Sequence, residues 1–272
     1  MTRRLALALA AALAGIYLLV SAPPPLPEGA QAGRAEAAAI PVKVLLDAAN
    51  AANSAARTIY TERIVSPGQE AGLVFGEEWR RPEREEGPLP ALFLRAVADS
   101  LQRQSSPLAL FLGSDKPISP SNAFTGEQVA AFEALKRDRR PRYFAMPDLD
   151  RQVALHADVA VAEGCVTCHN EHPRTPKKDW VRGDVMGATT WTYPAALVTE
   201  RELRAGLAQV YAAIEEAYRA YLDKTGRFAD PPVIGAEWPG KGRRRLPDAE
   251  TFMAAVREAS ALAVLEGAVL LR

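Results

Sequence analysis

Apolar residues recur at spacings of three and four along several stretches of the chain, a period that predicts amphipathic helices. The first helix is expected to begin near Pro41, because proline is tolerated in a first helical turn, and to end at the Ser-Pro-Gly breaker at residues 66–68. Its apolar stripe comprises Val44, Leu45, Ala48, Ala52, Ala55, Ala56, Ile59 and Tyr60. A second helix is expected over residues 91–103, with Leu94, Val97, Ala98 and Leu101 on one face.

Capping residues indicate three further helices. Thr125 followed by Gln128, and Thr199 followed by Glu202, both match the capping-box pattern, and Asp248 is placed to cap a last helix. The first of these helices is expected to close before Pro141. Each of the three helices is expected to turn one apolar face inward. In the helix after Thr125 this face comprises Val129, Phe132 and Leu135. In the helix after Thr199 it comprises Leu203, Leu207, Val210, Ile214, Ala217, Tyr218 and Tyr221, and in the last helix Phe252, Val256 and Leu262.

Short stretches with apolar runs, alternation or β-branched residues predict strands at 108–112, 142–147, 151–161 and 183–193. Residues 76–90 are charged and rich in Pro and Gly, which is typical of a solvated loop. The order of these elements predicts an α+β fold, in which helices and a small antiparallel sheet are followed by a helical C-terminal extension.

The N-terminus has the organisation of an export signal. Arg3 and Arg4 precede the apolar run 5–20, which as a helix would be about 24 Å long and so shorter than a hydrocarbon core of roughly 30 Å. Proline-rich sequence and the small-x-small pattern at 30–32 follow. We therefore expect residues 1–32 to be a cleaved signal peptide, with an N-terminal membrane anchor as the alternative, and we expect a periplasmic location.

Composition limits the partners. The 272 residues include 33 Lys+Arg and 33 Asp+Glu, so the formal net charge is zero and no basic excess favours nucleic acid. A hydrophobic share of 48% and a charged share of 24% are ordinary for a globular protein. Only two cysteines are present, which excludes a dense disulfide framework.

Both cysteines fall in one motif. Residues 165–169 read Cys-x-x-Cys-His, the attachment pattern of c-type haem. Thiols three residues apart can add to the two vinyl groups on one edge of a porphyrin, and the next residue, His169, is then placed to bind the iron as the proximal ligand. Predicted export agrees with this interpretation, because c-type haem is attached outside the bacterial cytoplasm. We therefore expect Cys165 and Cys168 to carry one covalent haem c.

Three other interpretations of the motif are open. Cys165 and Cys168 can form a lone disulfide in an oxidising compartment. They can also form a thioredoxin-like redox pair, although no βαβ pattern surrounds them. A zinc site needs two more strong ligands, for which only His156 and His172 remain.

The sixth iron ligand is not evident from the sequence. The candidates on the distal side are Met146, His156 and Met186, and each can equally be core filler or a surface residue. Met253 is a further candidate, and His172 is too close to His169 to reach the opposite face of the same haem. A vacant distal position would permit binding of small molecules, whereas a strong protein ligand would favour electron transfer.

Basic and aromatic residues follow the motif closely. The candidates for pairing with the haem propionates are Arg174, Lys177, Lys178 and Arg182. A solvated charged loop is the alternative explanation for them. Trp180 and Trp191 can pack on the porphyrin or fill the core.

The stretch CVTCHNEHPRTPKKDWVRGDVMGA, residues 165–188, resembles a family of exported single-haem c-type domains with a PAS-like fold. This family is described as a domain of unknown function, and it occurs alone or as the extracytoplasmic sensing module of signalling proteins. The resemblance implies a PAS-like haem-binding domain over residues 40–195, with Cys165 and Cys168 carrying the haem and His169 as proximal ligand. Residues 196–272 then form the helical extension.

The chain departs from the family in one respect. Some members place a cysteine of the N-terminal helix on the distal face of the iron, but residues 41–63 contain no cysteine here.

We expect a mono-haem protein that senses a redox change or a gas, or that transfers one electron to a redox partner protein. The alternative is a haem enzyme of the peroxidase or nitrite-reductase type with an open distal site, and the chain shows no distal histidine–arginine pair for it.

Overall fold

The computed structural model of the chain describes residues 39–238 and 243–270, and the side chains as far as 264. The predicted export signal at 1–32 lies outside the described residues. The helices are α3 (Val42–Tyr60), α4 (Ser66–Glu70), α5 (Pro90–Arg103), α6 (Glu127–Asp138), α7 (Glu163–Glu171), α8 (Glu200–Thr225) and α9 (Ala249–Leu270). A π-helical turn (Thr61–Val65) joins α3 to α4, and short 3₁₀ turns lie at Pro120–Asn122 and Pro147–Leu149.

Four strands form the main sheet, and the predicted α+β class is confirmed. β4 (Ala109–Gly113), β5 (Arg142–Met146), β6 (Arg151–Val159) and β7 (Val185–Tyr193) are antiparallel in the order β4-β7-β6-β5. The other strands are short and pair two by two: β1 (Ile40–Pro41) with β8 (Leu197–Val198), β2 (Val74–Gly76) with β3 (Glu86–Pro88), and β9 (Val233–Ile234) with β10 (Arg245–Leu246).

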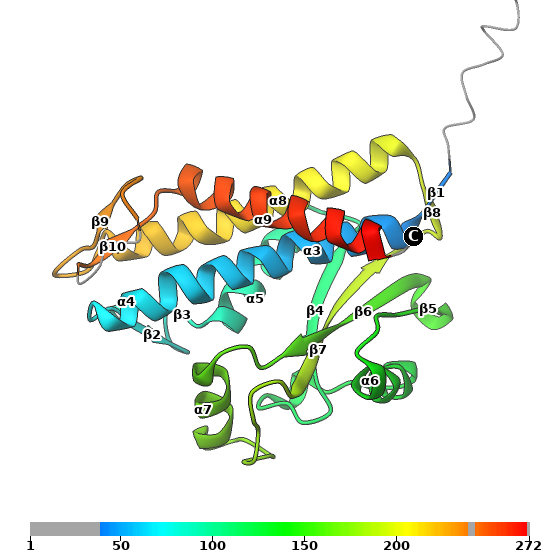
Figure 1. Cartoon of the computed structure of the whole chain (residues 1–272), viewed down its shortest axis with the longest axis horizontal. Coiled ribbons are helices and arrows are strands. Elements are labelled where there is room, and N and C mark those ends of the chain that lie inside the picture. Colours follow the sequence, from blue (N-terminus) through cyan, green and yellow to red (C-terminus); the bar gives the residue numbers. More distant parts are fainter. Residues whose placement is uncertain (1–38, 239–242, 271–272) are drawn as a thin grey trace, which may run out of the picture. The chain divides into compact units, whose positions relative to one another are not determined.

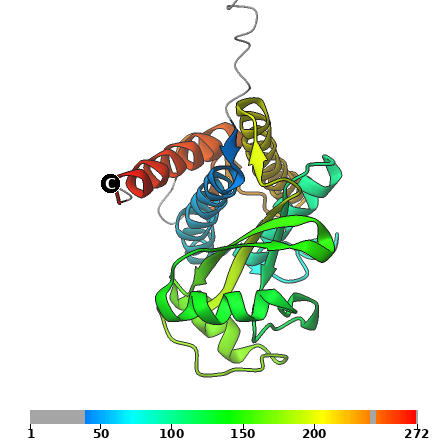
Figure 2. The ribbon, with the colours of Figure 1, turned by 90° about the vertical axis from the view of Figure 1, so that its right-hand side faces the viewer.

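Helices cover both faces of the main sheet. α3 lies on one face and α6 on the other, as Figure 2 shows. Along β6, Ala154 joins the large apolar cluster on the α3 side, whereas its neighbours Val153 and Leu155 pack with Phe132 and Leu135 of α6. This alternation is the expected consequence of successive side chains pointing to opposite faces of a strand.

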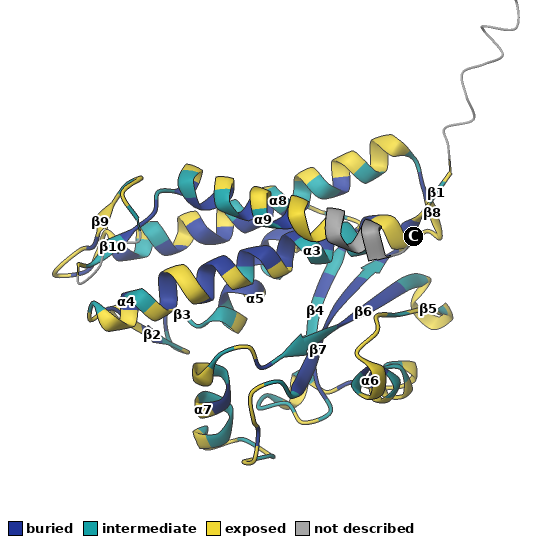
Figure 3. Ribbon diagram, in the orientation of Figure 1, coloured by how far each residue is buried: buried dark blue, intermediate teal, exposed yellow. Residues whose placement is uncertain are grey.

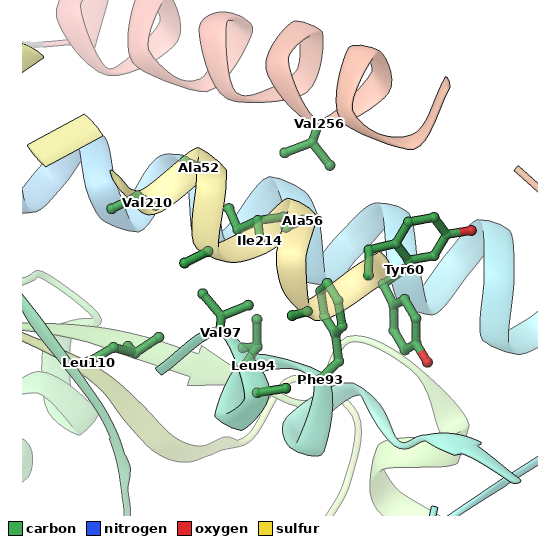
Figure 4. Packing of buried hydrophobic residues seen from close by; sticks show 14 of the residues in the cluster. Ala52, Ala56, Tyr60, Phe93, Leu94, Val97, Leu110, Val210, Ile214 and Val256 are labelled. Atoms are coloured by element: carbon green, nitrogen blue, oxygen red, sulfur yellow. The ribbon is translucent and has the colours of Figure 1, made fainter. Parts of the chain in front are cut away.

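The largest core lies among α3, α5, α8 and α9, and Figure 4 shows part of it. Tyr60 stacks on Phe93 at 4.3 Å between ring centroids, and Phe252 of α9 stacks on Tyr218 of α8 at 4.1 Å. Val97 and Ile214 are fully buried between these helices. The C-terminal helices therefore share one core with the N-terminal helices, and Ala39–Arg272 is a single compact unit.

Two helix ends differ from the sequence prediction. The first helix does not stop at residues 66–68, because the π-helical turn places Pro67 in the first turn of α4, where the missing proline N–H interrupts no hydrogen bond. Thr125 does not cap α6. The N-cap is Gly126, whose φ of +55° turns the chain away from Thr125, and no side-chain cap is formed.

Some inward faces were also predicted wrongly. Val44, Val129 and Leu262 are 46%, 44% and 56% exposed, because each lies beside the buried stripe of its helix rather than on it. Residues 76–90 are only partly a solvated loop, since Trp79 is 6% exposed and Glu86–Pro88 form a strand.

The capping box of Thr199 and Glu202 is confirmed, with Glu202 N–H donating to Thr199 Oγ1 at 3.2 Å and Thr199 N–H donating to Glu202 Oε2 at 2.7 Å. Asp248 accepts a hydrogen bond from Thr251 N–H at 2.7 Å and caps α9 as expected. Across the described ranges, no helix is both long and apolar enough to cross a bilayer.

Candidate functional site

The Cys-x-x-Cys-His motif lies on the short helix α7. The chain enters it from an extended N-cap at Ala162, with Glu163 in the first turn, and leaves it at His172, which precedes Pro173. The spacing of three places Cys165 and Cys168 about one turn apart on the same side of α7. Both are free thiols of intermediate exposure. Most of α7 is exposed or half-buried, as Figure 3 shows.

One apolar contact surface holds α7 against the sheet. Val166, the buried residue of α7, packs with Ala160, Trp180 and Met186, and Cys165 packs against their edge. We call these residues the Trp180 cluster. It is separate from the two larger apolar clusters on either side of the sheet. The position of the two thiols therefore depends on Trp180 and Met186 more than on the main core.

Asn170 fixes the loop that returns from α7 to β7. Its Nδ2 donates to the Trp180 carbonyl at 2.9 Å, and its Oδ1 accepts from Trp180 N–H at 2.9 Å. Gly183 has a φ of +91°, a conformation that favours glycine, and its N–H donates to the Ala160 carbonyl at 3.0 Å. The residues Asn170, Trp180 and Gly183 after the motif therefore form hydrogen bonds that close this loop.

A β-bulge directs Met186 towards α7. Asp158 pairs with Gly187 and Val159 pairs with Val185, so Met186 is the extra residue of β7 between two pairs. Its side chain is 8% exposed and belongs to the Trp180 cluster. Among the three expected distal candidates, Met186 is therefore the one that lies beside the motif helix.

His169 is half-buried, and its ring meets that of Trp180 edge-on, at 6.5 Å between centroids and 87° between planes. Burial lowers the pKa of His169, while the nearby Asp158 carboxylate opposes this shift and His172 and Arg57 add to it. Within the part of the chain that the structure describes, Nδ1 of His169 has no hydrogen-bond partner. The neutral imidazole is therefore the favoured form.

Arg57 connects α3 to the end of β6 beside His169. It forms an ion pair with Asp158, and its Nη2 donates to the Val159 carbonyl at 3.2 Å. The Arg57 and Asp158 side chains are 20% and 31% exposed, so the pair is partly shielded from water. Neither residue was expected at the site, because 101 positions separate them and no local pattern marks either one.

Glu77 contacts the C-terminal end of α7, although it belongs to the segment expected to be a solvated loop. Its Oε1 lies 2.9 Å from His172 Nε2, and its Oε2 lies 3.5 Å from Arg174. Burial raises the pKa of Cys168, and the negative charge of Glu77 raises it further. The Cys168 thiol is therefore favoured over the thiolate.

The other distal candidates lie elsewhere. Met146 packs in the apolar cluster on the α6 side of the sheet. His156 lies on the α3 side, with Nε2 3.5 Å from Asp47 Oδ1 and its ring edge-on to Tyr143. Met253 is buried in the main core among the long helices.

The basic residues after the motif are divided among several contacts. Lys177 lies 2.7 Å from Asp179 and over the Trp180 ring at 4.3 Å, and Arg174 faces Glu77. Lys178 and Arg182 are exposed. Trp191 is fully buried in the main core, away from the Trp180 cluster.

Across residues 39–238 and the described C-terminal part, no three His, Cys, Asp or Glu side chains gather to hold a metal ion.

The fold and the site define an α+β protein in which an antiparallel sheet positions one short helix with two free thiols and an adjacent imidazole. The Tll0287-like family model matches residues 34–194, and the chain belongs to this family. The match ends where β7 ends, so α8 and α9 lie outside it. No curated protein and no solved structure matches the chain.

Proposed function

We propose that this protein binds one covalent haem c and acts outside the cytoplasm, as a redox or gas sensor or as a one-electron carrier. The observation that carries the proposal is the geometry of α7, where two free, half-buried thiols one turn apart are followed directly by His169. The sequence after the motif resembles a PAS-like haem domain. An antiparallel sheet flanked by helices is compatible with that expectation. The periplasm is the compartment that the predicted signal and this chemistry favour together.

The donor set fits a c-type haem. Each thiol can add across one vinyl group, so that sulfur bonds to one vinyl carbon and the thiol hydrogen goes to the other, and no oxidant is consumed. Burial and the negative charge of Glu77 raise the pKa of Cys168, so this sulfur is a thiol at neutral pH, the form that the overall addition consumes. His169 is mostly neutral at neutral pH, which is the form that binds iron. The bound haem supplies an iron that changes between the ferric and ferrous states.

The chain's own residues hold this donor set in place. Asn170 and Val166 fix α7 to the loop and to the Trp180 ring, so the thiols and the imidazole keep one orientation. The Arg57–Asp158 pair lies near His169 in a partly shielded position, where charges influence a redox centre more than in water. These residues position and tune the site, and they do not bind the haem covalently.

A direct test is the absorption spectrum of the protein secreted by cells that mature c-type cytochromes, recorded oxidised and reduced. We expect a pyridine haemochrome typical of two thioether bonds, and the Cys168→Ser variant should lose the second bond. Carbon monoxide added to the ferrous protein separates the roles, since binding indicates a sensor with a labile distal face and no binding indicates a carrier. A haem that is fully released by denaturation and solvent extraction would contradict the proposal.

A further inference from the structure

A surface rich in Lys and Arg adjoins the Trp180 cluster. It is formed by residues 136–142, at the C-terminal end of α6, and by residues 177–184, which lead from α7 to β7. Arg139 Nη2 donates to the Gly183 carbonyl at 2.8 Å, so the two segments are in direct contact. Asp115 and Lys116 line the same open hollow between them. We call these two segments, with Asp115 and Lys116, the basic surface.

The charges of the basic surface do not cancel. Together with Glu133 of α6, it contains nine Lys or Arg and five Asp or Glu, whereas the whole chain has 33 of each. Three of its cations form ion pairs with four carboxylates, each at 2.7 Å: Lys136 with Asp115 and Glu133, Arg142 with Asp138, and Lys177 with Asp179. The fifth carboxylate, Asp184, accepts a hydrogen bond from Val181 N–H at 3.1 Å.

The other six cations of the basic surface are exposed, and none forms an ion pair among the residues that the structure describes: Lys116, Arg137, Arg139, Arg140, Lys178 and Arg182. Six such cations against one carboxylate leave a local positive charge on a molecule that is neutral as a whole. A positive surface of this kind attracts and orients a negatively charged partner.

Trp180 joins the basic surface to the motif helix. Its ring meets that of His169 edge-on, at 6.5 Å between centroids, and Lys177 Nζ lies 4.3 Å from its centroid. Trp180 also lines the open hollow of the basic surface. An aromatic side chain therefore lies between the imidazole proposed to bind iron and the exposed cations.

Apolar contact area adjoins the cations. Val161 and Val181 are both exposed. Their segments lie side by side, because Gly183 N–H donates to the Ala160 carbonyl at 3.0 Å and Ala160 N–H donates to the Asp184 carbonyl at 2.9 Å. Apolar area beside uncompensated charge is typical of interfaces between proteins. A projecting side chain of a protein can also enter the hollow, which the flat surface of a bilayer cannot.

We propose that an acidic redox partner protein docks on the basic surface, with its carboxylates against Arg139, Lys178 and Arg182, and exchanges one electron with the haem past Trp180. This inference rests on the proposed function for its redox step. One electron passes from the ferrous haem to the oxidised partner, which leaves a ferric haem and a reduced partner, and no bond forms or breaks.

Fluorescence anisotropy of a labelled ten-residue glutamate peptide tests the docking surface on the haem-loaded chain and on a Cys165→Ser/Cys168→Ser variant. We expect saturable binding to both proteins, which weakens as salt rises. Lys178→Glu/Arg182→Glu should weaken it about tenfold or more. Arg95→Glu/Arg227→Glu is the matched control, because it changes the net charge equally at exposed arginines outside the basic surface, and it should largely retain the affinity.

Oxidation of the ferrous haem-loaded protein by ferricyanide tests the electron route. The rate should fall as salt rises, because the oxidant is an anion, and it should fall about tenfold in Lys178→Glu/Arg182→Glu at low salt. A cationic cobalt(III) tris-phenanthroline oxidant should show the opposite dependence on salt. The control Arg95→Glu/Arg227→Glu should change both rates much less.

Four results would overturn the proposal: no saturable binding of the peptide, equal losses in the two charge-reversed variants, unchanged ferricyanide kinetics in Lys178→Glu/Arg182→Glu, or binding to phosphatidylglycerol vesicles without binding of the peptide. The last result would mean that the basic surface contacts a membrane. A chain that carries no haem but binds the peptide would contradict the proposed function and with it the redox step, while the acidic docking partner would stand.

Discussion

At the scale of single residues, burial has different consequences for His169 on α7 and His156 on β6. His169 is half-buried at the edge of the fold, where a ligand can reach it, whereas the His156 side chain is 11% exposed beneath α3. Asp47 is close to His156, but its two carboxylate oxygens already accept hydrogen bonds from Tyr143 and Lys43. Burial therefore outweighs Asp47 and lowers the pKa of His156 to about 4.

This shift makes stability depend on pH. The unfolded chain takes up a proton on His156 below about pH 6.5, but the folded protein does so only below about pH 4, so stability falls as the pH drops through this window. Between pH 7 and 5 the loss from this group is about 2 kcal/mol. Urea denaturation at both pH values should show a smaller loss for His156→Gln than for the unmodified chain. An equal loss in both proteins would contradict the burial argument.

The methionines allow a second test at this scale. Met186 lies in the Trp180 cluster beside α7, whereas Met146 packs on the α6 side of the sheet. We expect Met186→Leu to change the absorption spectrum and the reduction potential of the haem-loaded protein, and the control Met146→Leu to leave both unchanged. The reverse result would place the distal ligand on the other face of the sheet.

Sequence alone predicts the residues of the site that are contiguous and not those brought together by folding. Cys165, Cys168 and His169 are evident from their spacing. Arg57 and Glu77 reach the site from segments far away in the chain, and each looks like an ordinary surface charge in its own local sequence. The polar contacts that tune a site are therefore less predictable than the atoms that perform its chemistry.

At the scale of elements, the two capping-box patterns show how far a local motif can be relied on. Thr199 and Glu202 form both hydrogen bonds of the box, because Thr199 is the residue at the helix boundary. Thr125 precedes a glycine that takes over the N-cap position through its positive φ. The four strands of the main sheet were predicted within a few residues, whereas the short paired strands were not predicted. The π-helical turn after Tyr60 carries no periodic signal that could predict it.

The cap of α8 can be tested with a matched pair of variants. Thr199→Ala removes the hydrogen bond to Glu202 N–H and should lower the free energy of unfolding by about 1 kcal/mol. Thr125→Ala, at an exposed threonine that caps nothing, should change it by less than about 0.5 kcal/mol. Chemical denaturation of both variants measures the difference, and equal losses would show that the cap of α8 contributes nothing.

At the scale of the whole molecule, the helices after residue 195 complete the core on the α3 side of the sheet. Composition and periodicity predicted an α+β fold with a C-terminal helical extension. They did not predict that α9 would pack on α3 and α8 on α5, because both contacts join residues far apart in the chain. The matched family segment, residues 34–194, therefore shares its main core with helices outside it.

This shared core predicts cooperative unfolding. Phe252 of α9 is fully buried between Tyr218 and Phe93, so Phe252→Ala should destabilise the protein by about 3–5 kcal/mol. Fluorescence and circular dichroism should still follow one common transition. Leu262→Ala, at a residue of the same helix that is 56% exposed, is the control and should have little effect. A separate, undisturbed transition of the sheet would show that the extension folds independently.

The covalent haem is the central proposal, and mass spectrometry of the denatured secreted protein tests it most directly. We expect the mass of the polypeptide plus one haem, with the added mass on the peptide that contains Cys165 and Cys168. A Cys165→Ser/Cys168→Ser variant from the same cells should carry no added mass. An unmodified polypeptide with both thiols free, from cells that attach haem to another c-type cytochrome, would contradict the proposed function.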